Sequence, residues 1–149
     1  MTAIRKITSE DRDFFIAASK AFYASAAVAH DVPASYHLTT FEELMNSEVY
    51  QSGYILEVDG ASVGYALVSK TFSHEAGGTV WWLEELYILP EYRGKGLGRS
   101  YFDFIEKAAA ENGVRRLRLE VEPDNTRAAK LYSNLGYKPL NYAQMLKEF

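Results

Sequence analysis

The spacing of hydrophobic residues predicts helices in the first third of the chain. Residues 3–7 form a short alternating stretch, which predicts a strand. Hydrophobic side chains then recur every three or four positions over residues 11–27, which predicts an amphipathic helix. A capping pattern at residues 39–42 predicts a second, shorter helix after a loop at residues 30–35. Three residues of this helix are expected to face inward, namely Phe41, Leu44 and Met45.

From residue 53 the pattern changes to that of strands. Two runs rich in β-branched and aromatic residues flank Asp59-Gly60, a dipeptide that strongly favours a hairpin turn. Residues 79–88 predict an apolar strand, and residues 115–121 alternate hydrophobic with charged residues as a half-buried strand does. An amphipathic helix ending at Asn112-Gly113 separates these two strands. Two strands joined through a helix are expected to lie side by side and parallel.

The end of the chain predicts one more helix and one more strand. Residues 124–134 are expected to be helical up to Gly136, and residues 142–147 to return as a final antiparallel strand. With 149 residues, of which 48% are hydrophobic, the chain is predicted to be a single domain, residues 1–149.

Composition narrows the classes of function. The chain has no cysteine, which excludes disulfides and a thiol nucleophile, and its three scattered histidines do not predict a metal site. A net charge of −4 argues against a nucleic-acid partner. No signal-peptide core and no apolar run of about 20 residues is present, so no membrane association is expected and a cytoplasmic protein is predicted.

A glycine-rich loop between a strand and a helix is the clearest chemical signal. Its three glycines occupy alternate positions, where main-chain N–H groups can approach an anion closely, and the helix start adds positive potential. The spacing matches neither a dinucleotide fingerprint nor a Walker A loop. The loop contains Arg93, Gly94, Lys95, Gly96, Leu97, Gly98 and Arg99.

Two motifs resemble those of the GNAT N-acetyltransferase superfamily. Arg93-x-x-Gly96-x-Gly98 is similar to the motif that wraps the pyrophosphate of coenzyme A. A second segment, Asn125 to Tyr137, resembles the family's N-x-x-A-x-x-L/F-Y-x-x-x-G-F/Y motif. The resemblance implies an α/β (α+β) GNAT fold, with a mixed, mostly antiparallel sheet of six to seven strands. It also implies helices on both faces and a splayed central pair of parallel strands.

The resemblance implies acetyl-CoA as the acetyl-donor cosubstrate, with no metal. The pantetheine arm is expected to lie between the splayed strands, where unpaired main-chain groups need partners. Asn125 either bonds the pantetheine or caps its own helix. The expected cosubstrate contacts are Leu86, Tyr87, Ile88, the loop residues Arg93, Gly94, Lys95, Gly96, Leu97, Gly98 and Arg99, and Asn125.

Acetyl transfer to an amine needs a base for the ammonium and an acid for the departing thiolate. The stretch beginning at Leu83 resembles one in spermidine/spermine N-acetyltransferases, and this resemblance implies Glu84 as the base. Neighbours on a strand face opposite sides, so only one of Glu84 and Glu85 is expected in the cleft, and a strand irregularity would exchange their roles. Tyr132 matches the motif tyrosine and is implied as the acid, the alternative being a core tyrosine.

The predicted activity is direct acetyl transfer to a primary amine in a ternary complex. The acceptor is expected to be a polyamine or another small amine. Alternatives are a peptide or protein N-acetyltransferase, or a coenzyme A-binding sensor without turnover. Many family members are dimers, so a homodimer is possible. Candidate substrate contacts are Trp82 and Glu85 on the strand, and Tyr36 and His37 near the first two helices, which are otherwise ordinary loop residues.

Overall fold

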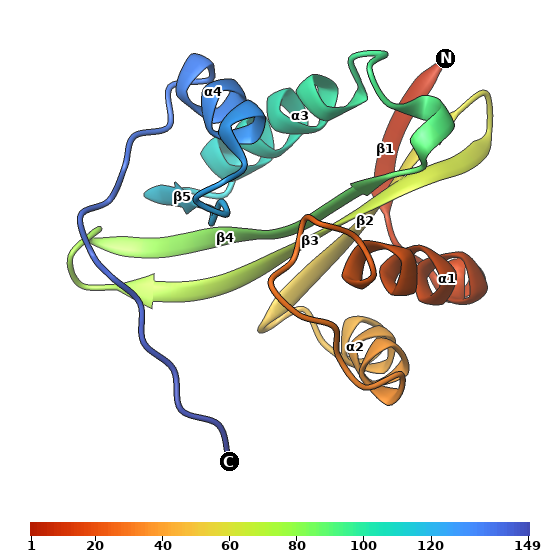
Figure 1. Cartoon of the computed structure of the whole chain (residues 1–149), viewed down its shortest axis with the longest axis horizontal. Coiled ribbons are helices and arrows are strands. Elements are labelled where there is room, and N and C mark those ends of the chain that lie inside the picture. The colour runs from red at the N-terminus through yellow and green to blue at the C-terminus, as the bar shows by residue number, and fades with distance from the viewer.

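A computed structural model describes all residues, 1–149, and contains one mixed sheet covered by four helices (Figure 1). The strands are β1 (Thr2–Lys6), β2 (Gln51–Val58), β3 (Ala61–Ser73), β4 (Gly78–Ile88) and β5 (Arg116–Arg118). The helices are α1 (Arg12–Tyr23), α2 (Ser35–Asn46), α3 (Leu97–Glu111) and α4 (Thr126–Asn134). Short 3-10 turns occupy Ser9–Asp11 and Pro90–Tyr92. No helix is long and apolar enough to cross a membrane.

The strands follow their order in the chain, β1-β2-β3-β4-β5, and only the β4–β5 pair is parallel. The hairpin predicted at Asp59-Gly60 is confirmed, because both residues have positive φ and join the antiparallel strands β2 and β3. The predicted parallel neighbours are confirmed as β4 and β5. The sheet has five strands, however, so the expectation of six to seven was wrong.

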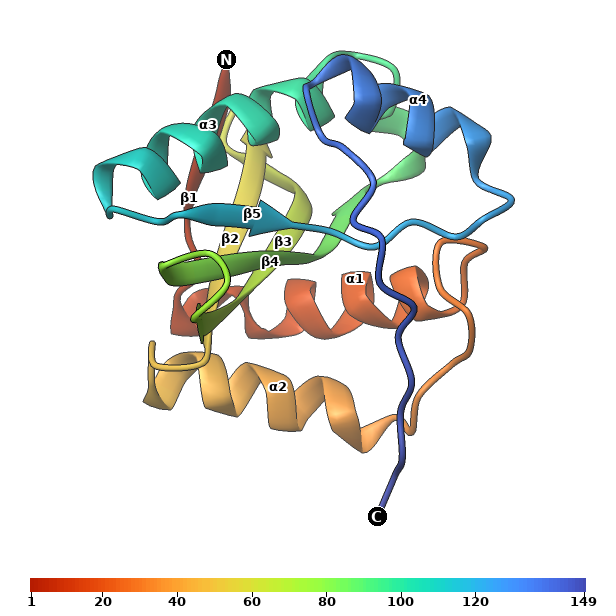
Figure 2. The ribbon, with the colours of Figure 1, turned by 90° about the vertical axis from the view of Figure 1, so that its left-hand side faces the viewer.

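The strand predicted at residues 142–147 does not form. Residues 138–149 run as an unpaired, exposed segment from the α4 side of the molecule to the opposite side (Figures 1 and 2). The Tyr142 hydroxyl donates to Glu75 in the β3–β4 connection at 2.8 Å. A side-chain hydrogen bond therefore replaces the expected main-chain ladder.

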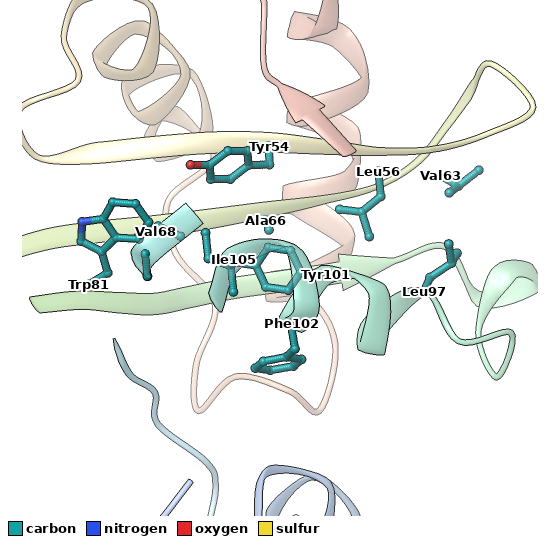
Figure 3. Packing of buried hydrophobic residues seen from close by; sticks show 11 residues of the cluster. Tyr54, Leu56, Val63, Ala66, Val68, Trp81, Leu97, Tyr101, Phe102 and Ile105 are labelled. Carbon is teal, nitrogen blue, oxygen red and sulfur yellow. The ribbon is translucent and has the colours of Figure 1, made fainter. Parts of the chain in front are cut away.

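Helices cover both faces of the sheet, as predicted, and each face has its own core. α1 and α2 pack on one face and α3 and α4 on the other (Figure 2). Figure 3 shows Leu97, Tyr101 and Ile105 of α3 packed on sheet residues such as Ala66. On the opposite face, Phe15 of α1 contacts Tyr65 edge to face, with ring centroids 5.1 Å apart. Two cores on one sheet hold its strands from both sides.

The first two helices differ from their predicted bounds. α1 ends at Tyr23 rather than near residue 27, because the Ser25 hydroxyl and main-chain N–H both donate to the Phe22 carbonyl and close the helix. α2 begins at Ser35, four residues early, two residues after Pro33. Tyr36 and His37, expected in a loop, therefore lie in the first turn of α2. Phe41 and Leu44 are buried as predicted, whereas Met45 is exposed, so its expected inward position was wrong.

Two features of β4 shape the site. Leu67 of β3 pairs with Glu85 but Val68 pairs with Leu83, so Glu84 is an extra residue, a β-bulge. On its other side, β4 pairs with β5 only at Val80, Trp81 and Trp82. β5 covers Arg116–Arg118 instead of the predicted residues 115–121, and the two strands separate beyond it. The splayed parallel pair expected from the family resemblance is therefore present.

Candidate active site

A cleft of about 150 Å³ opens where β4 and β5 separate. Residues of β4 form one wall, the segment after β5 forms another, and α3 and α4 contribute aromatic side chains. Main-chain groups of a strand point alternately to its two neighbours, so those of residues 83–88 on the β5 side have no partner strand. The cleft therefore exposes the hydrogen-bonding edge that an extended, amide-containing ligand needs.

The glycine loop lies between the end of β4 and the start of α3. Gly94 and Gly96 have φ of 73° and 85°, the left-handed region that glycine adopts without steric cost. Helix α3 begins at Leu97, and the first N–H groups of a helix have no partner within it. These donors and the dipole of a 15-residue helix make the loop suitable for a phosphate group.

The basic side chains of the loop are exposed and partly anchored. Arg93 donates from Nε to the Ile88 carbonyl at 2.8 Å and lies over the Tyr87 ring. Lys95 lies over the Tyr92 ring, with Nζ 5.2 Å from its centroid. The Arg93 anchor connects the loop to the free edge of β4. An extended ligand could therefore run from the loop into the cleft, and the residues present fit coenzyme A.

Helix α4 supplies the opposite side of the cleft. Asn125 caps α4 by accepting the Ala128 N–H at 3.1 Å, so the capping role is observed, and its side chain also lines the cleft. Tyr132 lines the cleft as well, with its ring 5.7 Å from that of Phe102. Burial raises the pKa of the Tyr132 phenol further above neutral pH. Tyr132 is thus a half-buried aromatic residue that lines the cleft and is protonated at pH 7.

The bulge brings both carboxylates of β4 to the cleft, so strict alternation is broken there. Glu84 is exposed, and its pKa is raised by desolvation and then by Glu120. Glu85 is more deeply placed and accepts hydrogen bonds from the hydroxyls of Tyr65 at 2.8 Å and Tyr23 at 3.3 Å. Burial raises the pKa of Glu85 to about 7, although both tyrosines oppose the shift.

A second, smaller cavity of about 90 Å³ lies on the other side of Glu85, between α1, α2 and β4. Tyr36 and His37 line it from α2. His37 is only 4% exposed, and its Nδ1 lies 2.8 Å from the hydroxyl of Ser19 in α1. Burial lowers the pKa of His37, so the ring is neutral at pH 7. The structure thus brings Tyr36, His37 and Glu85 together.

Trp82 lies apart from both hollows. The guanidinium of Arg118 lies over the Trp82 ring, with Cζ 4.0 Å from the ring centroid. The two residues are paired across β4 and β5. One face of the Trp82 ring is therefore already in contact with a cation of the same chain. Trp81 is buried in the α3-side core.

Sequence reasoning missed Ser19, Tyr23 and Tyr65. All three lie on elements that were predicted, but their inward positions match ordinary core spacing, and no motif marks them. A strand irregularity is the alternative that would exchange Glu84 and Glu85, and the sequence does not mark the position of the bulge. The one available signal was a polar group within an apolar run, such as the hydroxyl of Tyr65 in the second hairpin strand.

These features together define the GNAT fold: a mixed sheet, a splayed parallel pair, and a glycine loop at a helix start. The model of the acetyltransferase (GNAT) family matches residues 12–137, and the chain belongs to this family.

Curated relatives are named as amine acetyltransferases. The chain is similar to thialysine N-epsilon-acetyltransferase of Bos taurus, with 38% identity over 82 residues, covering 55% of this chain and 48% of the relative. It is also similar to aminoglycoside N(6')-acetyltransferase type 1 of Salmonella typhimurium (strain LT2), with 25% identity over 109 residues, covering 71% and 74%. The chain spans about half the length, 48%, of the thialysine acetyltransferases of Bos taurus and Sus scrofa.

Solved structures share the fold across the whole chain. A possible acetyltransferase from Clostridium difficile 630 superposes with a TM-score of 0.88 at 19% identity, covering 100% of this chain and 98% of the other. The aminoglycoside acetyltransferase AAC(6')-Iy, in complex with a bisubstrate analogue containing coenzyme A, gives 0.82 at 19% identity, covering 100% and 99%.

Proposed function

We propose that the protein transfers the acetyl group of acetyl-CoA to a primary amine, directly, in a ternary complex. The observation that carries this proposal is the continuous path from the glycine loop along the free edge of β4 to Glu84 and Glu85. Along this path the loop and the edge of β4 offer main-chain hydrogen-bonding groups, and the side chains of Glu84 and Glu85 lie at its end. No cysteine is available to carry an acyl group, so direct transfer is favoured over a thiol intermediate.

The proposed cosubstrate contacts follow the path. The loop residues 93–99 would hold the pyrophosphate, and the main chain of Leu86, Tyr87 and Ile88 would bond the pantetheine. Asn125 already caps α4, so its contribution would be to shape the end of the cleft.

The proposed catalytic groups lie on facing walls. A carboxylate of the bulge, Glu84 in the sequence-based assignment, would take the proton from the amine. Tyr132, a phenol that is protonated at neutral pH, would give a proton to the departing thiolate. Both side chains line the same cleft, which supports this pairing.

The acceptor is proposed to be a small primary amine, with polyamines among the candidates. The side chains lining the two hollows include four glutamates and neither lysine nor arginine. Such walls favour a cationic acceptor. The names of the relatives, a thialysine and an aminoglycoside acetyltransferase, also describe acetylation of amines.

Thiol release from acetyl-CoA over a panel of amines, beside calorimetric binding of coenzyme A, tests this function. We expect release with small primary amines and loss of at least 10-fold in kcat for Tyr132→Phe. Tyr142→Phe removes a hydroxyl bonded to Glu75, away from the cleft, and should keep full activity. Coenzyme A binding without release from any small amine or peptide would instead indicate a sensor module.

A further inference from the structure

The cavity between α1, α2 and β4 has the chemistry of an ammonium site. Its lining contains one formally charged side chain, the Glu85 carboxylate, and aromatic residues such as Phe15 and Tyr36. A carboxylate with aromatic walls attracts a cation, by charge and through the ring faces. The volume of about 90 Å³ admits only the end of a molecule, a few heavy atoms.

Glu85 is held in a fixed position at this cavity. Tyr65 of β3 and Tyr23 of α1 donate hydrogen bonds to its two carboxylate oxygens, Oε1 and Oε2. Glu85 also lines the cleft between β4 and β5, so it forms the wall shared by the two hollows. A group bound to Glu85 from the cavity would therefore lie next to the proposed path of acetyl-CoA.

His37 supplies a second acceptor in the same cavity. Nδ1 of His37 lies 2.8 Å from the Ser19 hydroxyl, which also lies 3.2 Å from the Ile16 carbonyl. In the tautomer with the ring proton on Nδ1, the Ser19 hydroxyl donates to Ile16, and Nε2 is an acceptor on a residue that is 4% exposed and lines the cavity. The cavity thus offers hydrogen-bond acceptors to a group rich in N–H donors.

Resting on the proposed function, we propose that this cavity binds the acceptor's primary ammonium group and that Glu85, rather than Glu84, takes its proton. Glu85 does so while Tyr23 and Tyr65 donate hydrogen bonds to its carboxylate. The class of acceptor is an unbranched alkylammonium without a carboxylate beside the nitrogen. No cation lines the cavity to balance such a carboxylate, which would lie against Glu85.

The step balances within the ternary complex. The ammonium gives one proton to the Glu85 carboxylate, and the resulting amine attacks the acetyl carbon. The new N–C bond forms as the C–S bond breaks, and Tyr132 protonates the thiolate. The second proton that the nitrogen must lose to become an amide passes through water to the Tyr132 phenolate, and Glu85 releases its proton to water, so one proton is released in all.

Several titratable groups surround Glu85 and bear on its pH dependence. Tyr23 faces it from α1 and Tyr65 from β3, while Glu84 precedes it in β4. His37 of α2 lines the cavity, and Glu120, Glu122, Tyr101 and Tyr132 line the cleft. Loss of one tyrosine hydroxyl would raise the Glu85 pKa, because both phenols stabilise the ionised form.

Kinetics with matched variants test the role of Glu85. For Glu85→Gln we expect kcat/KM for pentylamine to fall at least 100-fold at unchanged coenzyme A affinity. For Tyr65→Phe the acid limb of the pH profile should move to higher pH. Tyr54→Phe deletes a buried hydroxyl on the other face of the sheet and should move neither. A Glu85→Gln enzyme with wild-type rate and profile would overturn the proposal and leave the proposed function standing.

A matched pair of acceptors tests the substrate class. Pentylamine and norleucine differ only by the carboxylate beside the amino group. We expect pentylamine to be preferred at least 10-fold in kcat/KM. Equal rates would overturn the assignment of the acceptor class.

A measurement without turnover separates the cavity from the proposed function. The Glu85 carboxyl signal in a ¹³C spectrum is identified by its loss in Glu85→Gln. Adding pentylammonium should lower its apparent pKa, whereas tetramethylammonium, which has no N–H donor, should not. No effect of pentylammonium would overturn the cavity assignment, whereas failure to bind coenzyme A would count against the proposed function alone.

Discussion

At the scale of single residues, Glu85 combines a stability cost with proposed chemistry. Burial holds its pKa at about 7 instead of its ordinary 4.5. A raised acid pKa means that the folded protein disfavours ionisation, so Glu85 destabilises the fold increasingly between these two pH values. Tyr23 and Tyr65 reduce that cost without removing it.

Glu85→Gln is predicted to stabilise the protein at neutral and alkaline pH. Above pH 7 the gain in the free energy of unfolding should be about 2 kcal/mol, after allowance for the partial exposure of Glu85. Below pH 4 the two proteins should be equally stable, because Glu85 is then protonated in both the folded and unfolded states. Urea unfolding at pH 4 and pH 8 measures the difference, and a pH-independent gain would contradict it.

The sequence identified Glu84 and Glu85 as a pair but not how deeply each lies or which groups each contacts. Residue spacing specifies which side chains alternate only while a strand remains regular, and the bulge at Glu84 interrupts β4. For Asn125 the sequence left capping and a cosubstrate contact as alternatives, and in the structure its side chain caps α4 and also lines the cleft. The hydrogen bonds to Glu85 come from Tyr23 and Tyr65, which are 62 and 20 residues away in the chain, and no motif marks either tyrosine.

At the scale of elements, a partly buried ion pair joins β1 to the 3-10 turn that precedes α1. Both terminal nitrogens of Arg5 donate to the Asp11 carboxylate at 2.8 Å, and the Thr8 N–H donates to the same carboxylate. Asp11 is only 5% exposed. The hydrogen bonds from Arg5 are the main cause that holds the pKa of Asp11 below its usual range.

Asp11→Asn is predicted to lower the free energy of unfolding by about 2 kcal/mol at pH 7, because Arg5 loses one of its two carboxylate partners and keeps only Glu57. A depressed pKa stabilises the fold above the ordinary pKa of aspartate, so the difference should shrink as pH falls below about 4. Asp13→Asn is the control, since Asp13 is 95% exposed in its pair with Arg12. Denaturant unfolding at pH 7 and pH 3 measures both variants, and equal losses would contradict the prediction.

Element types were more predictable than element ends. Hydrophobic periodicity located α1, α3 and the strands of residues 53–88, because each has a buried face, whereas capping and end signals located α2 and α4. The early end of α1 depends on Ser25 competing for one carbonyl, and the early start of α2 on a turn beginning at Pro33. Such local hydrogen bonds leave no periodic signal.

At the scale of the whole molecule, the proposed path of coenzyme A runs between β4 and the segment after β5, which no main-chain pairs join there. β4 and β5 share only three residue pairs, and beyond these pairs β4 and the segment after β5 line the cleft. A bound coenzyme A would bridge this gap and should raise the melting temperature, because it binds the folded state alone.

Gly96→Ala is predicted to weaken coenzyme A binding and to reduce the ligand-induced rise in melting temperature, because its φ of 85° strains alanine at the start of α3. Gly60→Ala is a matched control, since Gly60 has a φ of 82° in the β2–β3 turn and open space for a Cβ. Both variants should lose about 1 kcal/mol of stability. Only Gly96→Ala should lose affinity in calorimetry, and equal affinities would contradict the role of the loop.

The fold class and the glycine loop could be predicted from the sequence, while the strand number could not. Residues 142–147 have the composition of a strand, but strand formation also needs a neighbour in register, and β5 is only three residues long. Short β5 thus explains both the splayed cleft and the missing final strand.

The extra residue in β4 divides that strand into two halves of opposite phase. Before it, odd-numbered residues such as Trp81 and Leu83 face the α3 core, and after it even-numbered residues such as Leu86 and Ile88 do. Loss of any other residue within β4 would shift one half of the strand by one position and exchange the residues that face its two sides. Deletion of Glu84 itself would remove the bulge and restore regular alternation, with Leu83 and Leu86 still on the α3 side and Glu85 still on the α1 side. Of the positions in this strand, the bulge is therefore the one where a change of length leaves both faces intact.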